Sequence, residues 1–456
     1  MTFKNNVKLQ DKSYRTKNHG SLIFHLSALI LLFQSTAIAV AAPVIQHWET
    51  KNGARVYFVP APELPMVDVQ VIFDAGGSRD GNNGGIAQLT NNLLDDGAGK
   101  LNADQIAERF EGVGAQFGAS SFRDMAVTSL RSLTDPPLLQ PALETYALLL
   151  RDPTFPTTSF ERVRNQMLIA LQAEQQSPGD IASKAFYKAM YADHPYASPV
   201  LGTNESLNVL GRGDAVAFHK RYYVARNAVI AIVGAVDLTA AEALANTLVS
   251  GLPAGEAPPP LPEVPPLTNA QTIHVDYPST QTHVLIGHPG MTRDDPDYFA
   301  LYVGNHILGG SGLVSRISEE VREKRGLSYS AYSYFIPMRD KGPYTLGLQT
   351  RNDQADEAIN VLRATLRQFI DEGPTGKELK ASKQNITGGF PLRISSNSKI
   401  VENISAIGFY NLPLDYLDTF NDHIDAVTIE QIKEAFKHRV HPDKMVTVTV
   451  GAGTAP

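Results

Sequence analysis

The feature that most constrains this chain is a proline-rich segment near its middle. Residues 252–267 contain seven prolines in sixteen positions. Proline fixes the backbone φ angle and has no amide hydrogen, so such a run cannot form a helix or a central strand. We therefore expect an extended linker between an N-terminal domain, 44–251, and a C-terminal domain, 268–453. Each of these segments has the usual length of an independently folded domain.

The two halves of the chain resemble one another. Each contains an apolar strand that leads to a glycine and then an apolar helix, and each ends in a basic stretch followed by a last apolar strand. Asn91 and Asn305 occupy corresponding helical positions 214 residues apart, and Gly234 and Gly451 follow the last strands 217 residues apart. This repeat predicts two similar domains that enclose a cavity.

Hydrophobic periodicity predicts the elements within each half. Residues 67–73 and 445–450 alternate between apolar and polar side chains, as half-buried strands do. Residues 138–150, 160–174 and 355–371 show the spacing of helices with one apolar face. Strands and helices in this order favour an α+β fold, with helices packed on one face of a mostly antiparallel sheet in each domain.

The first 41 residues have the layout of a secretory signal peptide. Five basic residues precede an apolar stretch, 22–33, and small residues at Ala37, Ala39 and Ala41 form two overlapping cleavage signals. We expect cleavage after Ala39 or Ala41 and a mature protein in a bacterial periplasm. Since the apolar stretch is too short to cross a bilayer, we expect no stable membrane anchor.

Composition excludes several classes of function. The chain has 40 Lys and Arg against 47 Asp and Glu, a formal net charge of −7, and no cysteine. An acidic balance without a basic block argues against nucleic-acid binding. The lack of cysteine excludes thiolate nucleophiles and thiolate metal ligands. Because the sequence shows no nucleophile elbow and no catalytic triad, a stand-alone hydrolase with unrelated residues ranks last among the functions considered.

Residues 85–92, Gly-Ile-Ala-Gln-Leu-Thr-Asn-Asn, carry the most informative local pattern. Gln88, Asn91 and Asn92 are spaced i, i+3 and i+4, so their side chains share one helix face. The stretch resembles the H-x-x-E-H motif of the insulinase/pitrilysin (inverzincin) family of zinc peptidases, and the resemblance extends over nearly all of 44–453. In that family the two histidines bind zinc and the glutamate is the general base. Gln88 and Asn92 stand at the histidine positions and Asn91 at the glutamate.

These amides cannot supply the missing chemistry. Zinc prefers histidine, cysteine or carboxylate donors, and an amide cannot accept a proton from water at neutral pH. The resemblance places the third zinc ligand of the family, a glutamate, at Leu168. We therefore expect no metal in this chain and no catalytic residue in this chain alone.

The C-terminal half keeps more of the family pattern. Residues 308–329 include Leu-Gly-Gly-Ser-Gly, Ser-Arg-Ile and Val-Arg-Glu-Lys-Arg-Gly-Leu-Ser-Tyr. This resembles the family segment in which an arginine and a tyrosine seven residues apart bind substrate opposite the zinc. The resemblance gives that role to Arg322 and Tyr329. The residues alone allow another interpretation, in which Arg322 pairs with Glu319 and Tyr329 is a core residue at the start of a strand.

Some members of this family work as pairs, in which one subunit carries the zinc motif and the other carries the arginine and the tyrosine. This sequence has the second pattern. The resemblance therefore implies a metal-free, substrate-binding partner subunit of a periplasmic zinc metallopeptidase heteromer. It also implies zinc in a sister subunit of the same family, and a peptide or small protein as substrate. The alternative is a catalytically inert scaffold or chaperone-like module that retains the peptidase fold.

Overall fold

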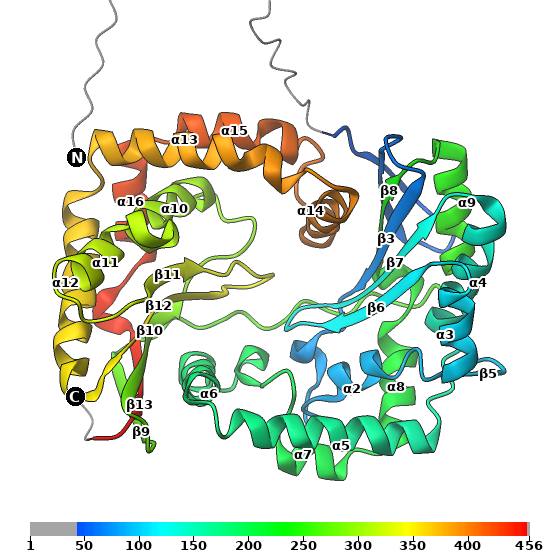
Figure 1. Ribbon diagram of the computed structural model, residues 1–456, viewed down its shortest axis with the longest axis horizontal. Helices are drawn as coiled ribbons and strands as arrows, with labels where there is room; N and C mark the ends of the chain where they lie inside the picture. The colour runs from blue at the N-terminus through cyan, green and yellow to red at the C-terminus, as the bar shows by residue number, and fades with distance from the viewer. Residues whose placement is uncertain (1–42, 454–456) are drawn as a thin grey trace, which may run out of the picture. The chain divides into compact units, whose positions relative to one another are not determined.

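The computed structural model describes residues 43–453, and the expected signal peptide lies outside them. The described strands form two large sheets, one on each side of residues 252–267, and a two-stranded ribbon (Figure 1). No helix within this range is long and apolar enough to cross a membrane. The two sheets, together with the helices given below, confirm the expected α+β class.

The N-terminal half builds a six-stranded sheet in the order β1-β2-β8-β3-β7-β6. Its neighbouring strands are antiparallel except for β2 and β8, which are parallel. The strands are β1 (Gln46–Glu49), β2 (Arg55–Pro60), β3 (Met66–Phe73), β6 (Gln116–Ser121), β7 (Ala126–Leu133) and β8 (Ala228–Gly234). The last strand of this half thus lies at the centre of its sheet.

The C-terminal half builds a five-stranded sheet in the order β11-β12-β10-β13-β9. The strands are β9 (Gln271–Asp276), β10 (Gln281–Pro289), β11 (Ala331–Phe335), β12 (Pro343–Arg351) and β13 (Val446–Gly451). Here too the last strand, β13, enters between earlier strands, parallel to β9 and antiparallel to β10. This is the arrangement of β8 between β2 and β3, so the sequence repeat is also a repeat in topology.

Helices cover these sheets in both halves. The N-terminal half contains α2 (Ile86–Asn92), α3 (Ala103–Glu111), α4 (Pro136–Arg151), α5 (Thr157–Glu174), α6 (Pro178–Tyr191), α7 (Asn204–Val209), α8 (Arg212–Tyr222) and α9 (Leu238–Val249). The C-terminal half contains α10 (Tyr298–Asn305), α11 (Arg316–Ser318), α12 (Ala355–Glu372), α13 (Gly376–Arg393), α14 (Asn397–Tyr410), α15 (Tyr416–Ala426) and α16 (Ile429–Arg439). The helices expected at 138–150, 160–174 and 355–371 are α4, α5 and α12. Figure 1 shows α3, α4 and α9 together on one side of the first sheet.

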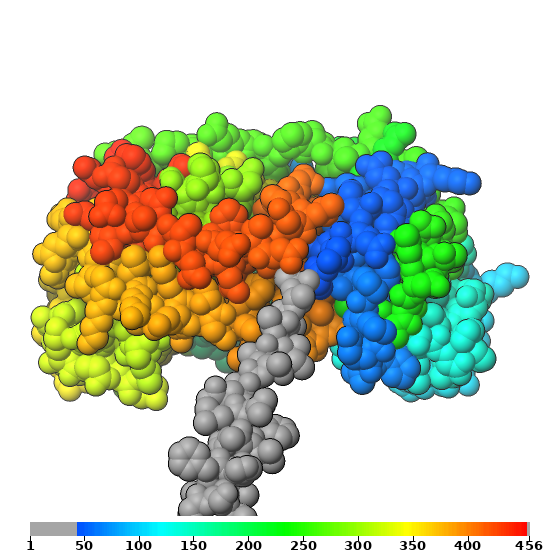
Figure 2. All heavy atoms as spheres, turned by 90° about the horizontal axis from the view of Figure 1, so that it is seen from above, coloured from blue at the N-terminus to red at the C-terminus, as the bar shows by residue number. Residues whose placement is uncertain are grey.

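The other face of the first sheet is covered by α14, a helix of the C-terminal half. Side chains alternate across a strand, and in β2 Val56 faces the N-terminal core whereas Tyr57 belongs to the core that contains Ile404 of α14. A Cβ on Gly408 would lie 2.6 Å from side-chain atoms of Tyr57 and Val229, so the helix approaches the sheet closely. Figure 2 shows this segment, in orange, directly against the blue N-terminal residues.

This packing corrects the expectation of half-buried strands at 67–73 and 445–450. In β3 every residue but Met66 and Gln70 is buried, because helices of both halves cover the sheet. All six residues of β13 are buried as well. The two threonines of β13 lie on the second face and are bonded there: Arg363 donates to Thr447 at 2.6 Å, and Nδ1 of His274 lies 2.8 Å from the hydroxyl of Thr449.

Residues 252–267 contain neither helix nor strand, as the prolines predict, but they are held in place. Val264 is fully buried, and its backbone N–H donates to Asp340 of the C-terminal half at 2.8 Å. Nε2 of His194, in the N-terminal half, lies 2.8 Å from the carbonyl oxygen of Pro262. The segment is therefore fixed to both halves and is not a free tether.

A buried histidine makes stability dependent on pH. Nδ1 of His288 lies 2.7 Å from the carbonyl oxygen of Pro289, and Nε2 accepts the backbone N–H of His441 at 3.2 Å, an arrangement that requires the neutral ring. Burial lowers the pKa of His288 to about 4, below the value of about 6.5 in the unfolded chain. Its contribution is therefore present above pH 6.5 and is lost as the pH falls towards 4.

We expect His288 to account for a loss of about 3 kcal/mol in the free energy of unfolding between pH 7 and pH 4. The His288→Leu variant should be less stable at pH 7, since the N–H of His441 loses its acceptor, but its stability should fall less on acidification. Denaturant unfolding at pH 7, 6, 5 and 4 measures both effects. His438→Gln, at an exposed histidine, is the control. If the free energy of unfolding fell with pH by the same amount in His288→Leu and in the unmodified chain, this assignment would be wrong.

Candidate functional site

The helix that carries Gln88, Asn91 and Asn92 is α2, and it begins at a glycine in the left-handed region. Gly85 has a φ angle of 90°, and a Cβ there would lie 2.8 Å from the carbonyl oxygen of Leu201. The carboxylate of Asp80 accepts the backbone N–H groups of Gly85 at 2.6 Å and of Ala87 at 3.0 Å. Burial raises the pKa of Asp80 to about 7. A buried carboxyl group thus fixes the start of this helix.

The three motif positions are bonded within the protein. Nε2 of Gln88 donates to Oδ1 of Asn92 at 2.8 Å, so the two amides at the expected histidine positions pair with each other. Asn91 is fully buried, and its Oδ1 accepts the hydroxyl of Tyr223 at 3.1 Å. Burial raises the pKa of Tyr223, which keeps its hydroxyl protonated as a donor. This helix face therefore carries hydrogen bonds between neutral groups at all three positions, and the buried Nδ2 of Asn91 has no partner among the described residues.

These residues do not fit a zinc ion. Leu168, at the position of the third ligand, lies on α5 and packs against the N-terminal core. Glu161 and Glu174 on the same helix are paired with Arg164 and Lys184. Within residues 43–453, no three His, Asp or Glu side chains converge as a metal site would require. The mismatch follows from the donor types, since a catalytic zinc site needs three protein ligands of the histidine or carboxylate kind.

We expect the triple variant Gln88→His, Asn91→Glu, Asn92→His to bind no stoichiometric zinc, because it restores two ligands and the base but not the third ligand. Adding Leu168→Glu should produce zinc binding, since α5 packs against α2. Elemental analysis after gel filtration measures the zinc content, and thermal unfolding with and without zinc controls for folding. One zinc per chain in the triple variant, or in the unmodified chain, would show that the site is complete without residue 168.

Arg322 and Tyr329 lie together in the C-terminal half. Arg322 belongs to a short π-helical turn, Glu319–Glu323, and its guanidinium carbon is 4.5 Å from the centre of the Tyr329 ring. Its Nε is 3.4 Å from Glu323, whereas Glu319 pairs with Lys324. The alternative ion pair between Arg322 and Glu319 is therefore not formed.

Tyr329 is not a core residue, because it is 81% exposed. Nη1 of Arg322 is buried yet has no hydrogen-bond partner among the described residues. Buried donors are normally bonded, so the guanidinium of Arg322 retains hydrogen-bonding capacity that the described residues do not use. The two side chains that the resemblance selects thus lie together, with the exposed ring of Tyr329 over the partly buried guanidinium.

A polar cluster that joins the two halves was not anticipated from the sequence. Asp74, at the end of β3, accepts two hydrogen bonds of 2.7 Å from Arg79 and one of 2.6 Å from Nη1 of Arg339, which lies in the turn between β11 and β12. The side chains of Asp74 and Arg79 are only 2% and 7% exposed. The same turn is fixed a second time, because Asp124 accepts the backbone N–H of Arg339 at 2.9 Å.

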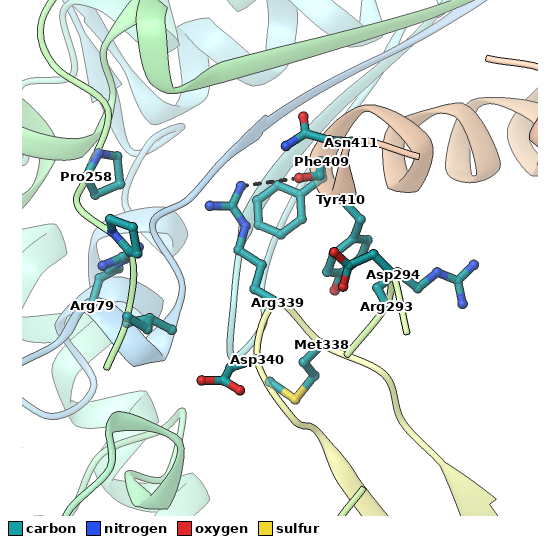
Figure 3. A pocket seen from close by; sticks show the side chains of 12 residues that line it. Arg79, Pro258, Arg293, Asp294, Met338, Arg339, Asp340, Phe409, Tyr410 and Asn411 are labelled. Carbon is teal, nitrogen blue, oxygen red and sulfur yellow. Dashed lines mark hydrogen bonds between the residues drawn. The ribbon is translucent and has the colours of Figure 1, made fainter. Parts of the chain in front are cut away.

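A cavity of about 330 Å³ lies beside this cluster (Figure 3). Three arginines line it, but each guanidinium is bonded: Arg79 and Arg339 to Asp74, and Arg293 to the hydroxyl of Tyr298 at 2.7 Å. Figure 3 also shows the bond from Arg339 to the carbonyl oxygen of Phe409, at the end of α14. Arg79 and Arg339 therefore join the two halves through Asp74, whereas Arg293 is held by a neutral hydroxyl within the C-terminal half.

Comparison with known proteins identifies the family of this chain. Residues 55–204 match the family model described as "Insulinase (Peptidase family M16)", and residues 210–386 match "Peptidase M16 inactive domain". The crystal structure of a peptidase M16 inactive domain from Pseudomonas fluorescens is 41% identical, with a TM-score of 0.87, and the match covers 90% of this chain and 98% of that one. The chain belongs to the insulinase family, peptidase family M16.

Two curated relatives carry different descriptions. "Non-peptidase homolog YmxG" of Helicobacter pylori is 26% identical over 420 residues, which is 90% of this chain and 94% of that protein. "Uncharacterized zinc protease YmxG" of Bacillus subtilis is 25% identical over 418 residues, 91% of this chain and all of that protein. This chain is therefore a member of the family in which amides replace the two histidines and the glutamate of the zinc motif, and its second half matches the domain described as inactive.

Proposed function

We propose that this chain is the substrate-binding, metal-free subunit of a heteromeric zinc metallopeptidase in the periplasm. The sister subunit belongs to the same family and carries the zinc site. This chain contributes Arg322 and Tyr329 to the binding of a peptide or small protein. The observation that carries the proposal is the contrast between two sites in one chain. The two histidine positions hold neutral amides that bond to each other, whereas the exposed ring of Tyr329 lies over the guanidinium of Arg322, which has no strong ion pair of its own.

The chemistry of the pair suits peptide binding. The guanidinium stays charged and offers a planar set of N–H donors, which fit a peptide carbonyl or a terminal carboxylate. Its stacking on Tyr329 restricts both side chains before substrate arrives, and so reduces the entropy lost on binding. The hydroxyl of Tyr329 donates one hydrogen bond to the oxygen that becomes negative when water attacks the peptide carbonyl.

The second candidate function is a scaffold or chaperone-like module without a part in catalysis. The Helicobacter pylori relative, which is described as a non-peptidase homolog, favours this candidate. The polar cluster around Asp74 also suits a protein in which two halves are held in a fixed arrangement.

Peptide turnover by the reassembled pair separates the two candidates. If the chain binds substrate, substitutions at Arg322 and Tyr329 lower turnover while the pair still assembles. If the chain is a scaffold, the same substitutions leave turnover unchanged, and only substitutions that prevent assembly reduce it.

A further inference from the structure

A second cavity, of about 430 Å³, lies between α6 of the N-terminal half and the five-stranded sheet. Its walls combine small and aromatic residues of α6, such as Ala182, Ser183 and Phe186, with residues of β10, β11 and β12, such as Val284, Tyr332 and Leu348. A volume of this size is within the range of about 300–1,000 Å³ that is typical of small-ligand sites.

The lining carries no Lys, Arg, Asp or Glu. His283 is the one histidine in it, and burial lowers the pKa of that ring, so the ring is neutral at pH 7. The surface of the cavity is mostly apolar, and its polar groups include the hydroxyl groups of its tyrosines, serines and threonine and the amide of Gln349. A charged side chain would lose its hydration here without gaining a partner, so the cavity favours an uncharged, apolar occupant.

The cavity begins one residue beyond the Arg322–Tyr329 pair along the chain. Ser330, the residue after Tyr329, forms part of the wall, and Tyr332, Tyr334 and Ile336 follow at intervals of two. Residues at this interval lie on one face of a strand. Tyr334 and Ile336 are each 48% exposed. Large side chains exposed beside an apolar cavity are typical of binding sites.

The edge of β11 is not free for a peptide to extend the sheet there. Nδ2 of Asn305 donates to the carbonyl oxygen of Ser333 at 2.9 Å, which uses the outward acceptor in the middle of the strand. Gly309 covers the adjacent N–H, because a Cβ on Gly309 would lie 2.5 Å from the nitrogen of Ser333. A peptide at this position is therefore recognised through a side chain rather than through strand pairing.

We propose that this cavity is a specificity pocket for one aromatic or long aliphatic side chain of the peptide that Arg322 and Tyr329 hold. The proposal rests on the proposed function, and it narrows the substrate class to peptides with a large apolar residue next to the segment bound by the pair. The polar backbone of the peptide lies at Arg322 and Tyr329, and the apolar side chain enters between α6 and β11.

The test uses the mature chain and three labelled, capped heptapeptides of glycine and serine with a central phenylalanine, alanine or lysine. Fluorescence anisotropy measures each affinity. We expect the phenylalanine peptide to bind at least about tenfold more tightly than the alanine and lysine peptides. Ser183→Phe, which fills the cavity from α6, should abolish this preference. Ser250→Phe, at the exposed end of α9, should retain it, and melting temperatures of all variants control for folding.

A second variant keeps the test decisive if Ser183→Phe fails to fold. Tyr334→Ala removes one wall at a half-exposed position and should also reduce the preference for phenylalanine. Equal affinity for the three peptides, which includes no binding of any, would overturn the proposal. So would a preference that persists in both Ser183→Phe and Tyr334→Ala.

Arg322→Ala distinguishes failure of the pocket from failure of the proposed function. If both proposals hold, this variant weakens binding of all three peptides by the same factor and leaves the preference for phenylalanine intact. Equal peptide affinities that still depend on Arg322 would overturn the pocket alone. A preference that Ser183→Phe abolishes and Arg322→Ala leaves unchanged, with no loss of affinity, would support the pocket and overturn the role of the pair.

Discussion

Replacing Asp74 with alanine is expected to lower the free energy of unfolding by about 3–5 kcal/mol, the usual cost of removing one partner from a buried ion pair. Asp74 accepts hydrogen bonds from Arg79 and from Arg339, which come from different halves of the chain. Arg79 is only 7% exposed, so in the variant its charge stays buried without a counter-ion. Denaturant unfolding of the mature chain measures the loss.

Two variants make this prediction specific. Arg339→Ala should cost less than Asp74→Ala, because Asp74 and Arg79 remain paired and Arg339 is already one-third exposed. Asp353→Ala removes an ion pair with Arg351 in which both side chains are more than 60% exposed, and it should change stability by no more than about 0.5 kcal/mol. Equal effects of Asp74→Ala and Asp353→Ala would show that the cluster does not hold the halves together.

Replacing Arg322 with alanine, or Tyr329 with phenylalanine, is expected to lower peptide turnover by the assembled peptidase about a hundredfold. Loss of one donor to a developing oxyanion typically costs about 3 kcal/mol in the transition state. Arg322→Lys should also be poor, because an ammonium group cannot reproduce the planar donor pair. Turnover of a peptide by the reconstituted pair, at saturating substrate, is the measurement.

We expect these substitutions to leave folding and assembly with the sister subunit unchanged. Tyr329 is 81% exposed, and the ion pair of Arg322 with Glu323 is long and partly exposed, so each contributes little to stability. Arg325→Ala is the matched control, since it removes a neighbouring, exposed arginine that pairs with Glu320. The melting temperature verifies that each variant is folded, and co-elution with the sister subunit verifies that it assembles. Unchanged turnover in both Arg322→Ala and Tyr329→Phe would favour the scaffold.

The sequence was sufficient to predict the class of fold and the family. The proline-rich segment and the repeat of 214–217 residues predict two similar halves, and the five strands of the second sheet follow the same order as five of the six strands of the first. Residue types alone decide the metal chemistry, because Gln88, Asn91 and Asn92 cannot replace two histidines and a glutamate. These conclusions depend on local patterns, which a single sequence displays directly.

What the sequence could not predict depends on contacts between distant segments. The alternation in 67–73 suggests one solvated face, and only the packing of α14 against β3 and β8 shows that both faces are buried. The bond between Asn91 and Tyr223 joins residues 132 apart, and the bond between Asp74 and Arg339 joins residues 265 apart. Asp-Arg pairs are common in sequences, and nothing in their spacing identifies the pair that is buried. The cavity beside α6 depends on the same docking of the two halves.

Purification of the native protein from its own cell, followed by zinc analysis of each chain in the complex, tests whether this chain is the metal-free subunit of a heteromer. We expect a second chain with an intact H-x-x-E-H motif to co-elute and to carry about one zinc per chain, while this chain carries none. Recovery of this chain without a family partner, or with one zinc of its own, would contradict this proposal.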